Sequence, residues 1–458
     1  MARRFFIQTY GCQMNANEAG IVRTILESAG YEATRAEADA DVLLMMTCSV
    51  REHAEQRALG RLAAFRAQKE RRGRGTVIGV LGCMAQNLKE RLVEEQGADI
   101  VVGPDQYRRL PELIEQAAAG VRGLVATELT DECYDTILPR PASPVSALVT
   151  VMRGCNNYCT YCIVPYVKGR ERSRPPASII AEIRELAQRG IKEVTLLGQN
   201  VLAYRYEGCD FPGLLRQVAE IPGILRVRFL TSHPRDLDER LLECLQELPK
   251  VCPSLHLPLQ SGSDRVLRLM NRGYTRAEYL QKIDLVRRFL PAAALSTDIL
   301  VGFPAESEDD FAATLAVVAQ VRFDFAYMFR YSPRPGTTAV RITPQVPAQV
   351  AGERLSRLIN LQNRITRERN EELVGKEVEL LVEAEGPAGD GLRARTATNK
   401  VVILTGPAQV GELVLATVTQ VRGWTPIAKR LKTKEQRANG GERFAAAPCS
   451  LFPNLEEG

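Results

Sequence analysis

The sequence predicts an α/β protein of three parts: a doubly wound parallel sheet, a central partial (β/α) TIM-type barrel and a small C-terminal β-barrel. Three observations lead to this prediction. Apolar runs alternate with amphipathic helical stretches over most of the chain. Cysteines close several of these runs. Near the C-terminus, short strand-like runs separated by Gly and Pro replace the alternation.

The composition is that of a globular protein with reduced cysteines. The 458 residues are 45% hydrophobic and 25% charged, which allows about three domains with ample cores. Eleven cysteines without an export signal favour a cytoplasmic location and metal chemistry over disulfides. No stretch long enough to span a membrane is free of charge, so we expect no membrane contact. The 60 basic and 55 acidic residues are compatible with a nucleic-acid partner but do not demonstrate one.

Residues 1–138 alternate strand and helix signals and form the expected N-terminal domain. Cys12, Cys48 and Cys83 each close an apolar run, with spacings of 36 residues (12 to 48) and 35 residues (48 to 83). Ligands of open α/β sheets gather at the carboxyl ends of the strands. We therefore expect the three thiols to converge and to hold an auxiliary iron–sulfur cluster with one open iron. Three buried, unreactive cysteines are the alternative.

Residues 139–370 form the expected second domain, which begins with a Pro-rich linker. Cys155, Cys159 and Cys162 follow an apolar run in CxxxCxxC spacing. Three thiolates suit a cluster that normally takes four, so one iron stays open for a substrate. A structural zinc site is the alternative. Six parallel strands are expected at Ala147–Met152, Glu193–Leu197, Arg226–Leu230, Ser254–Pro258, Ala294–Val301 and Asp324–Arg330.

Polar side chains interrupt five of these strands or follow their ends, which predicts a ligand cavity at the carboxyl edge of the sheet. Ordinary turn chemistry is the alternative for each residue alone. For His233 and His256, a hydrogen-bonded role is favoured over metal ligation. The predicted cavity residues are Gln199, Asn200, Ser232, His233, Gln260, Asp298 and Arg330.

Two basic stretches have more than one interpretation. The segment 168–176 is either a phosphate-contacting loop beside the cavity or a solvated loop. Residues 371–434 form the expected C-terminal β-barrel, and its last run, 429–434, suits RNA together with nearby Trp424. The strands of this barrel are expected at 377–382, 392–396, 401–404 and 413–418. Residues 435–458 show no period and are expected to be a flexible tail. Five cysteines lack partner spacing and are interpreted as incidental: Cys133, Cys209, Cys244, Cys252 and Cys449.

The CxxxCxxC triplet resembles that of the radical S-adenosylmethionine (SAM) superfamily, whose open iron binds SAM for one-electron cleavage to a radical. The three modules in this order resemble the radical SAM methylthiotransferases over residues 3–434, ending in an RNA-binding TRAM domain. The runs Thr47–Arg57, Gly169–Pro175 and Leu196–Val201 match the branch that acts on tRNA. Met46 departs from the pattern, because the family generally has Asn there.

The resemblance implies two [4Fe-4S] clusters and SAM as cofactors. It implies a monomer that receives electrons from a donor such as flavodoxin or ferredoxin. The expected reaction converts N6-isopentenyladenosine next to the tRNA anticodon to its 2-methylthio derivative. The alternative substrate is threonylcarbamoyladenosine in tRNA. The competing class is a non-catalytic RNA-binding or electron-transfer protein, but electron transfer alone would favour four protein ligands per cluster and no cavity.

Overall fold

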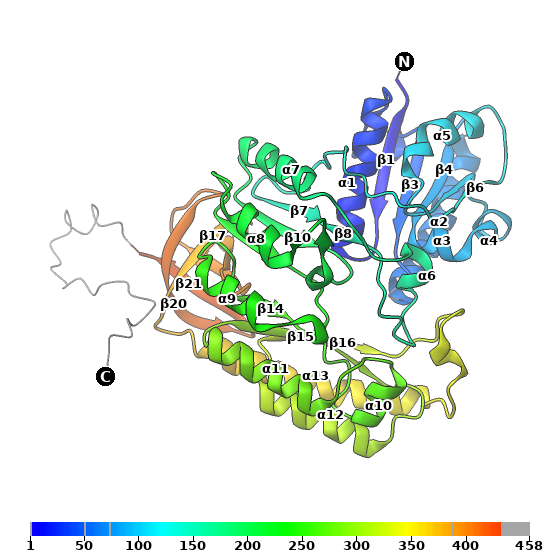
Figure 1. Cartoon of the computed structure of the whole chain (residues 1–458). Coiled ribbons are helices and arrows are strands. Elements are labelled where there is room, and N and C mark those ends of the chain that lie inside the picture. The colour runs from blue at the N-terminus through cyan, green and yellow to red at the C-terminus, as the bar shows by residue number, and fades with distance from the viewer. Residues whose placement is uncertain (1, 50–51, 73–74, 387–388, 390, 432–458) are drawn as a thin grey trace, which may run out of the picture.

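The computed structural model describes residues 2–49, 52–72, 75–386, 389 and 391–431. The chain folds into an N-terminal sheet unit, a central core and a C-terminal β-barrel, and the core lies between the other two (Figure 1). This architecture confirms the predicted fold class. Several predicted features lie outside the described residues: Arg51, Lys432, Lys434, Cys449 and the tail 435–458.

The N-terminal unit is a six-stranded parallel sheet in the order β2-β1-β3-β4-β5-β6. Separate hydrophobic clusters cover its two faces. β3 and β4 are buried along their whole length, as expected for central parallel strands. The strands are β1 Arg4–Thr9, β2 Glu32–Ala33, β3 Val42–Thr47, β4 Val77–Gly82, β5 Ile100–Val102 and β6 Leu124–Ala126. The helices are α1 Gln13–Ser28, α2 Glu52–Arg72, α3 Cys83–Leu88, α4 Glu90–Glu94 and α5 Leu110–Ala118.

The core is a partial barrel of six parallel strands, as the sequence predicts. Two three-stranded sheets, β7-β10-β13 and β14-β15-β16, meet through a bridge between Val227 and Val251. The strands are β7 Ser146–Thr150, β10 Glu193–Leu197, β13 Arg226–Phe229, β14 Ser254–His256, β15 Ala294–Val301 and β16 Phe325–Arg330. The covering helices are α7 Pro176–Gln188, α8 Phe211–Ala219, α9 Glu239–Glu247, α10 Asp264–Leu269, α11 Arg276–Phe289, α12 Glu308–Val321 and α13 Ala348–Glu371.

The N-terminal unit covers the free edge of the core sheet. β7 is the end strand of its sheet, and α1 packs against it. The Asn17 amide donates to the carbonyl of Leu148 (2.7 Å), and the Thr150 hydroxyl donates to the Asn17 side-chain oxygen (2.8 Å). An uncovered edge would leave backbone groups unpaired, so this contact fixes the two units side by side.

The C-terminal unit is a closed barrel in the order β17-β18-β19-β21-β20. Its strands are β17 Glu377–Glu385, β18 Leu392–Thr396, β19 Val401–Thr405, β20 Leu413–Arg422 and β21 Thr425–Arg430. The sequence predicts the first four strands but not β21, which closes the barrel by pairing with both β19 and β20. The barrel docks on the amino ends of the core strands, where Arg226 and Arg228 donate to its backbone. No helix of the described residues is long and apolar enough to cross a membrane.

Candidate functional site

Cys12, Cys48 and Cys83 meet at the carboxyl edge of the N-terminal sheet. Each follows the end of a strand, and these strands, β1, β3 and β4, are neighbours. Two glycines permit the close approach. A Cβ at Gly11 (φ +117°) would lie 2.4 Å from Cβ of Cys48, and one at Gly82 (φ +93°) would lie 2.6 Å from the carbonyl of Thr47. The backbone therefore brings these thiols together as the sequence predicts.

The three thiols have different environments. Cys12 is exposed, whereas Cys48 and Cys83 are buried. A hydrogen bond with Cys48 lowers the pKa of the Cys12 thiol to about 6. Burial raises the pKa of the Cys83 thiol to about 11, and the thiol also interacts with Cys12. Three soft sulfur donors suit iron–sulfur chemistry.

Cys155, Cys159 and Cys162 lie in one loop after the antiparallel strand β8, Met152–Arg153. All three are partly exposed. Burial and the neighbouring Cys159 raise the pKa of the Cys162 thiol to about 12. The loop turns at Gly154 (φ +78°), where a Cβ would lie only 1.9 Å from the carbonyl of Arg170. A side chain at this position would push the triplet away from the core.

No group of three His, Cys, Asp or Glu side chains in the described parts of the chain is arranged to hold a single metal ion. A cubic cluster has a different requirement, because each ligated iron takes its own thiolate. The donors of such a cluster stand apart instead of converging on one point. The two triplets supply this kind of donor set.

Arg272 is a site residue that the sequence analysis missed. Its side chain is buried and donates to the Cys159 sulfur at 3.4 Å. It also donates to the Tyr274 hydroxyl (3.0 Å) and to the Pro258 carbonyl (3.1 Å). A buried guanidinium at this distance stabilises negative charge on the thiolate. No motif identifies it, because it lies 113 residues from its sulfur partner.

Two of the predicted cavity residues keep unpaired polar atoms. Among the described residues, Oε1 of Gln199 and Nε2 of His233 are buried without a hydrogen-bond partner. His233 Nδ1 accepts the backbone N–H of Arg235 at 3.3 Å, so Nε2 carries the proton. Burial, together with Arg272 and Arg235, lowers the pKa of His233 to about 2. A buried polar atom without a hydrogen-bond partner destabilises the fold. Gln199 Oε1 is therefore available as an acceptor for a ligand, and His233 Nε2–H as a donor.

Asn200 and Ser232 bind within the protein. The Asn200 amide donates to Asp236 at 2.6 Å and accepts the backbone N–H of His233 at 3.0 Å. The Ser232 hydroxyl donates to the carbonyl of His256. These contacts hold the turn that carries His233 and occupy the polar atoms that were predicted to meet a ligand.

The other three predicted residues lie along the second half of the core. Gln260 adopts φ +65°, and its backbone bridges β15 by accepting the Leu300 N–H at 3.0 Å. Asp298 lies 3.4 Å from the His256 ring, consistent with a hydrogen-bonded role for that histidine. Arg330 is exposed at the end of β16, and its side chain makes no hydrogen bond or ion pair with other described residues.

The basic segment after the second triplet is neither of the two loops that the sequence analysis expected. Lys168, at the end of the short helix α6 (Val164–Lys168), is buried and paired with Glu18. Arg172 pairs with Asp105 at 2.9 Å, and Arg174 is buried against Glu182 at 2.7 Å. Both predictions for these three side chains were wrong, because each side chain pairs with a buried carboxylate. Glu18 and Asp105 come from distant parts of the chain, and Glu182 lies eight residues after Arg174. Arg170 remains exposed.

The two triplets are joined through α6. Cys83 packs in a small buried cluster with Ile163, which directly follows Cys162, and with Val167 of α6. The same helix ends at Lys168, whose partner Glu18 lies on α1 beside the other triplet. The N-terminal and core triplets therefore share one packed boundary.

Comparison with known proteins identifies all three units. Residues 4–103 match the uncharacterized protein family UPF0004, residues 149–318 match the radical SAM superfamily, and residues 371–429 match the TRAM domain. A tRNA-2-methylthio-N6-dimethylallyladenosine synthase from Phocaeicola vulgatus is 44% identical over 92% of this chain and 95% of its own length. The chain belongs to this synthase family. A synthase of the same name from a Thermoanaerobacter species is 45% identical over 92% of this chain and 91% of its own length.

A solved structure supports the fold. The radical SAM methyltransferase TsrM from Kitasatospora setae, with cobalamin and a [4Fe-4S] cluster bound, covers 74% of both chains with a TM-score of 0.57. Sequence identity is only 16%, so this likeness concerns the fold alone.

Proposed function

We propose that this chain is a radical SAM methylthiotransferase that converts N6-isopentenyladenosine next to the tRNA anticodon to its 2-methylthio derivative. The observation that carries the proposal is the pair of cysteine triplets on two domains, packed against each other through α6. Membership of the synthase family supports the same reaction. A protein that only transferred electrons would not need two sites with three cysteine ligands each.

The proposed ligand sets are Cys12, Cys48 and Cys83 for an auxiliary [4Fe-4S] cluster, and Cys155, Cys159 and Cys162 for the core cluster. The donor chemistry fits, because each set offers three free thiols to a cluster that normally takes four ligands. When bound, the core cluster would supply one-electron cleavage of SAM, and the auxiliary cluster would supply sulfur for methylthio transfer.

The protein side chains have separate proposed tasks. Gln199 Oε1 accepts from SAM and His233 Nε2–H donates to it, since both atoms are buried and unpaired among the described residues. Arg272 holds Cys159 through its 3.4 Å contact. Ser232, Gln260, Asp298 and Arg330 line the rest of the carboxyl edge, while Asn200 fixes the turn before His233.

The TRAM domain indicates an RNA partner, and tRNA is the proposed one. We propose that residues 1–138, 139–370 and 371–434 act as the auxiliary-cluster, radical and RNA-binding domains. We also propose a cytoplasmic monomer that receives electrons from a flavodoxin or ferredoxin. The chain has eleven cysteines, six of them in the proposed ligand sets, and this supports a reducing compartment.

The test is nucleoside mass spectrometry of tRNA from a deletion strain that carries the wild-type gene or a triple alanine variant. Substituting Cys155, Cys159 and Cys162 should abolish both SAM cleavage and methylthiolation in the reconstituted protein and leave about half the iron. Substituting Cys12, Cys48 and Cys83 should keep SAM cleavage and abolish methylthiolation. Cys133→Ala with Cys209→Ala is the matched control, since these thiols belong to neither triplet. Full iron content in both triple variants would contradict the ligand assignment.

A competition among three tRNA forms tests the substrate. Burying the five-carbon dimethylallyl group contributes roughly 4 kcal/mol, at about 0.8 kcal/mol per carbon. A pocket with an apolar wall penalises the carboxylate of a threonylcarbamoyl group. Isopentenylated tRNA should therefore be turned over first, with unmodified and threonylcarbamoylated tRNA far behind. Preferential methylthiolation of the threonylcarbamoyl form would assign the chain to the alternative substrate.

A further inference from the structure

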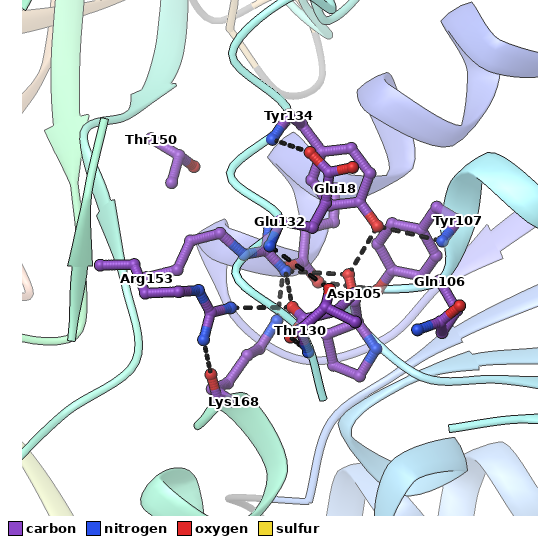
Figure 2. A network of polar contacts seen from close by, with 12 residues as sticks. Glu18, Asp105, Gln106, Tyr107, Thr130, Glu132, Tyr134, Thr150, Arg153 and Lys168 are labelled. Atoms are coloured by element: carbon purple, nitrogen blue, oxygen red, sulfur yellow. Dashed lines mark hydrogen bonds and ion pairs between the residues drawn. The ribbon is translucent and has the colours of Figure 1, made fainter. Parts of the chain in front are cut away.

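A buried group of charged side chains fills the boundary between the N-terminal unit and the core (Figure 2). Glu18 of α1 and Arg153 of β8 are fully buried, and Arg153 Nη2 lies 2.9 Å from Glu18 Oε1. Lys168 Nζ binds the same carboxylate oxygen, Glu18 Oε1. The Tyr107 hydroxyl donates to the second oxygen, Glu18 Oε2, at 3.0 Å. Glu18 is thus held by two cations from the core and one hydroxyl from its own domain.

This charged cluster carries excess positive charge. Glu18 and Asp105 face three cations, because Asp105 lies 3.7 Å from Arg153 and 2.9 Å from Arg172. Burial alone raises the pKa of Glu18, and the charges of Lys168 and Arg153 more than offset it, so the pKa is lowered and the carboxylate stays ionised. Protonation of Asp105 would only increase the excess. Glu132 also interacts with Arg153, but it is paired with Arg108 at 2.5 Å, so cations still outnumber carboxylates in this group.

The auxiliary triplet lies next to this excess charge. Cys83 packs on Val167, the residue before Lys168, and both Lys168 and Glu18 are close enough to interact electrostatically with Cys12 and Cys83. Charges at such short range in a buried setting are weakly screened by water and salt. One of these two charges, Lys168, thus comes from the core, six residues after Cys162.

We propose that Lys168 and Glu18, whose side chains carry opposite charges, tune the reduction potential of the iron–sulfur group on Cys12, Cys48 and Cys83. They act as positioning residues, through the charge that they place beside the group. The reduced form of such a group carries one more negative charge than the oxidised form, and neighbouring charge and burial set its reduction potential. Lys168 favours the reduced form and Glu18 opposes it. The inference rests on the proposed ligand role of these three cysteines.

The test is a redox titration of the auxiliary cluster, followed by electron paramagnetic resonance, in full-length reconstituted protein. Alanines at Cys155, Cys159 and Cys162 remove the overlapping signal of the core cluster. Lys168→Met removes the charge at nearly constant length and leaves Glu18 its 2.9 Å partner Arg153, so it should shift the midpoint to lower potential. Glu18→Gln should shift it to higher potential. Lys168→Arg should restore the wild-type midpoint.

Lys69→Met is the matched control. Lys69 pairs with Asp99 at 2.6 Å in the same domain, but Asp99 precedes β5 at the amino edge of the sheet, away from the cysteines. This variant should leave the midpoint unchanged.

A purely structural role would destabilise both Lys168→Met and Glu18→Gln without shifts of opposite sign. Unshifted midpoints, or shifts of the same sign, would overturn the inference. If Lys168→Met does not fold, Glu18→Gln and Lys168→Arg still decide between these outcomes. Absence of iron in the background protein would instead overturn the ligand assignment itself.

Discussion

Docking of the C-terminal barrel on the core depends on Arg226 at the start of β13. Its side chain is 4% exposed and donates to the Arg395 carbonyl at 2.6 Å and to the Glu379 carbonyl at 3.1 Å. Arg226→Met keeps the aliphatic stem and removes both hydrogen bonds. Hydrogen bonds from a charged donor contribute about 1.5–3 kcal/mol each, so docking should weaken by about 3–6 kcal/mol. The ion pair with the half-exposed Glu379 side chain adds less than about 1 kcal/mol.

Differential scanning calorimetry of the full chain measures this loss. In the wild type, the barrel and the core should unfold together, whereas in Arg226→Met the barrel transition should separate and move to lower temperature. tRNA affinity should fall in parallel, because two tethered RNA-binding surfaces lose their fixed relative orientation.

Arg216→Met is the control for the Arg226 experiment. Arg216 pairs with Glu247 at 2.6 Å on the exposed surface of the core, and loss of such a pair costs at most about 1 kcal/mol. If the Arg226 variant unfolds like the Arg216 variant, the barrel is not held by these hydrogen bonds and the reasoning is refuted.

Two further predictions concern RNA contact and acid stability. Trp424 is 60% exposed, so Trp424→Ala should weaken tRNA binding by about 1–3 kcal/mol of stacking energy. This change should leave the salt dependence of tRNA affinity unaltered, whereas Lys429→Ala should reduce that salt dependence. Equal salt slopes in binding titrations of the two variants would contradict this division. His233 has a pKa of about 2 in the folded protein and about 6.5 when unfolded, so the folded state loses stability as pH falls from 6.5 towards 2, by about 1.4 kcal/mol per pH unit. In His233→Gln, the free energy of unfolding measured with urea should depend less on pH between 6.5 and 2. If its pH dependence equals that of the wild type, the ring is protonated in the folded state.

The regular elements were predictable because their local patterns agree with their final environments. All six core strands end within two residues of the predicted ends. β10 and β13 are buried along their whole length, as their apolar runs indicate, whereas β16 keeps Phe325 and Tyr327 exposed. The convergence of Cys12, Cys48 and Cys83 was predictable because the carboxyl ends of parallel strands lie at one edge of a sheet, and β1, β3 and β4 are adjacent and parallel.

The elements that the sequence analysis missed have long-range causes. β21 contains Pro426, which weakens a strand signal, and Lys429 was interpreted as part of a basic run. The pairing of β21 with β19 and β20 stabilises this strand only once the barrel closes. Lys168 was expected in an exposed loop, but its partner Glu18 lies 150 residues away, and no local pattern encodes that pairing.

The position of the C-terminal barrel separates RNA binding from chemistry. The barrel contacts Arg226, the first residue of β13, and Lys400 pairs with Asp324 just before β16 at 2.7 Å. Both contacts are at the amino ends of core strands, whereas both cysteine triplets follow carboxyl ends. An RNA that touches the barrel must extend along the core to bring its target base to the triplets. Changes in the barrel should therefore alter the affinity and orientation of the RNA, whereas changes at Glu18 and Lys168 should alter the reduction potential of the proposed auxiliary cluster.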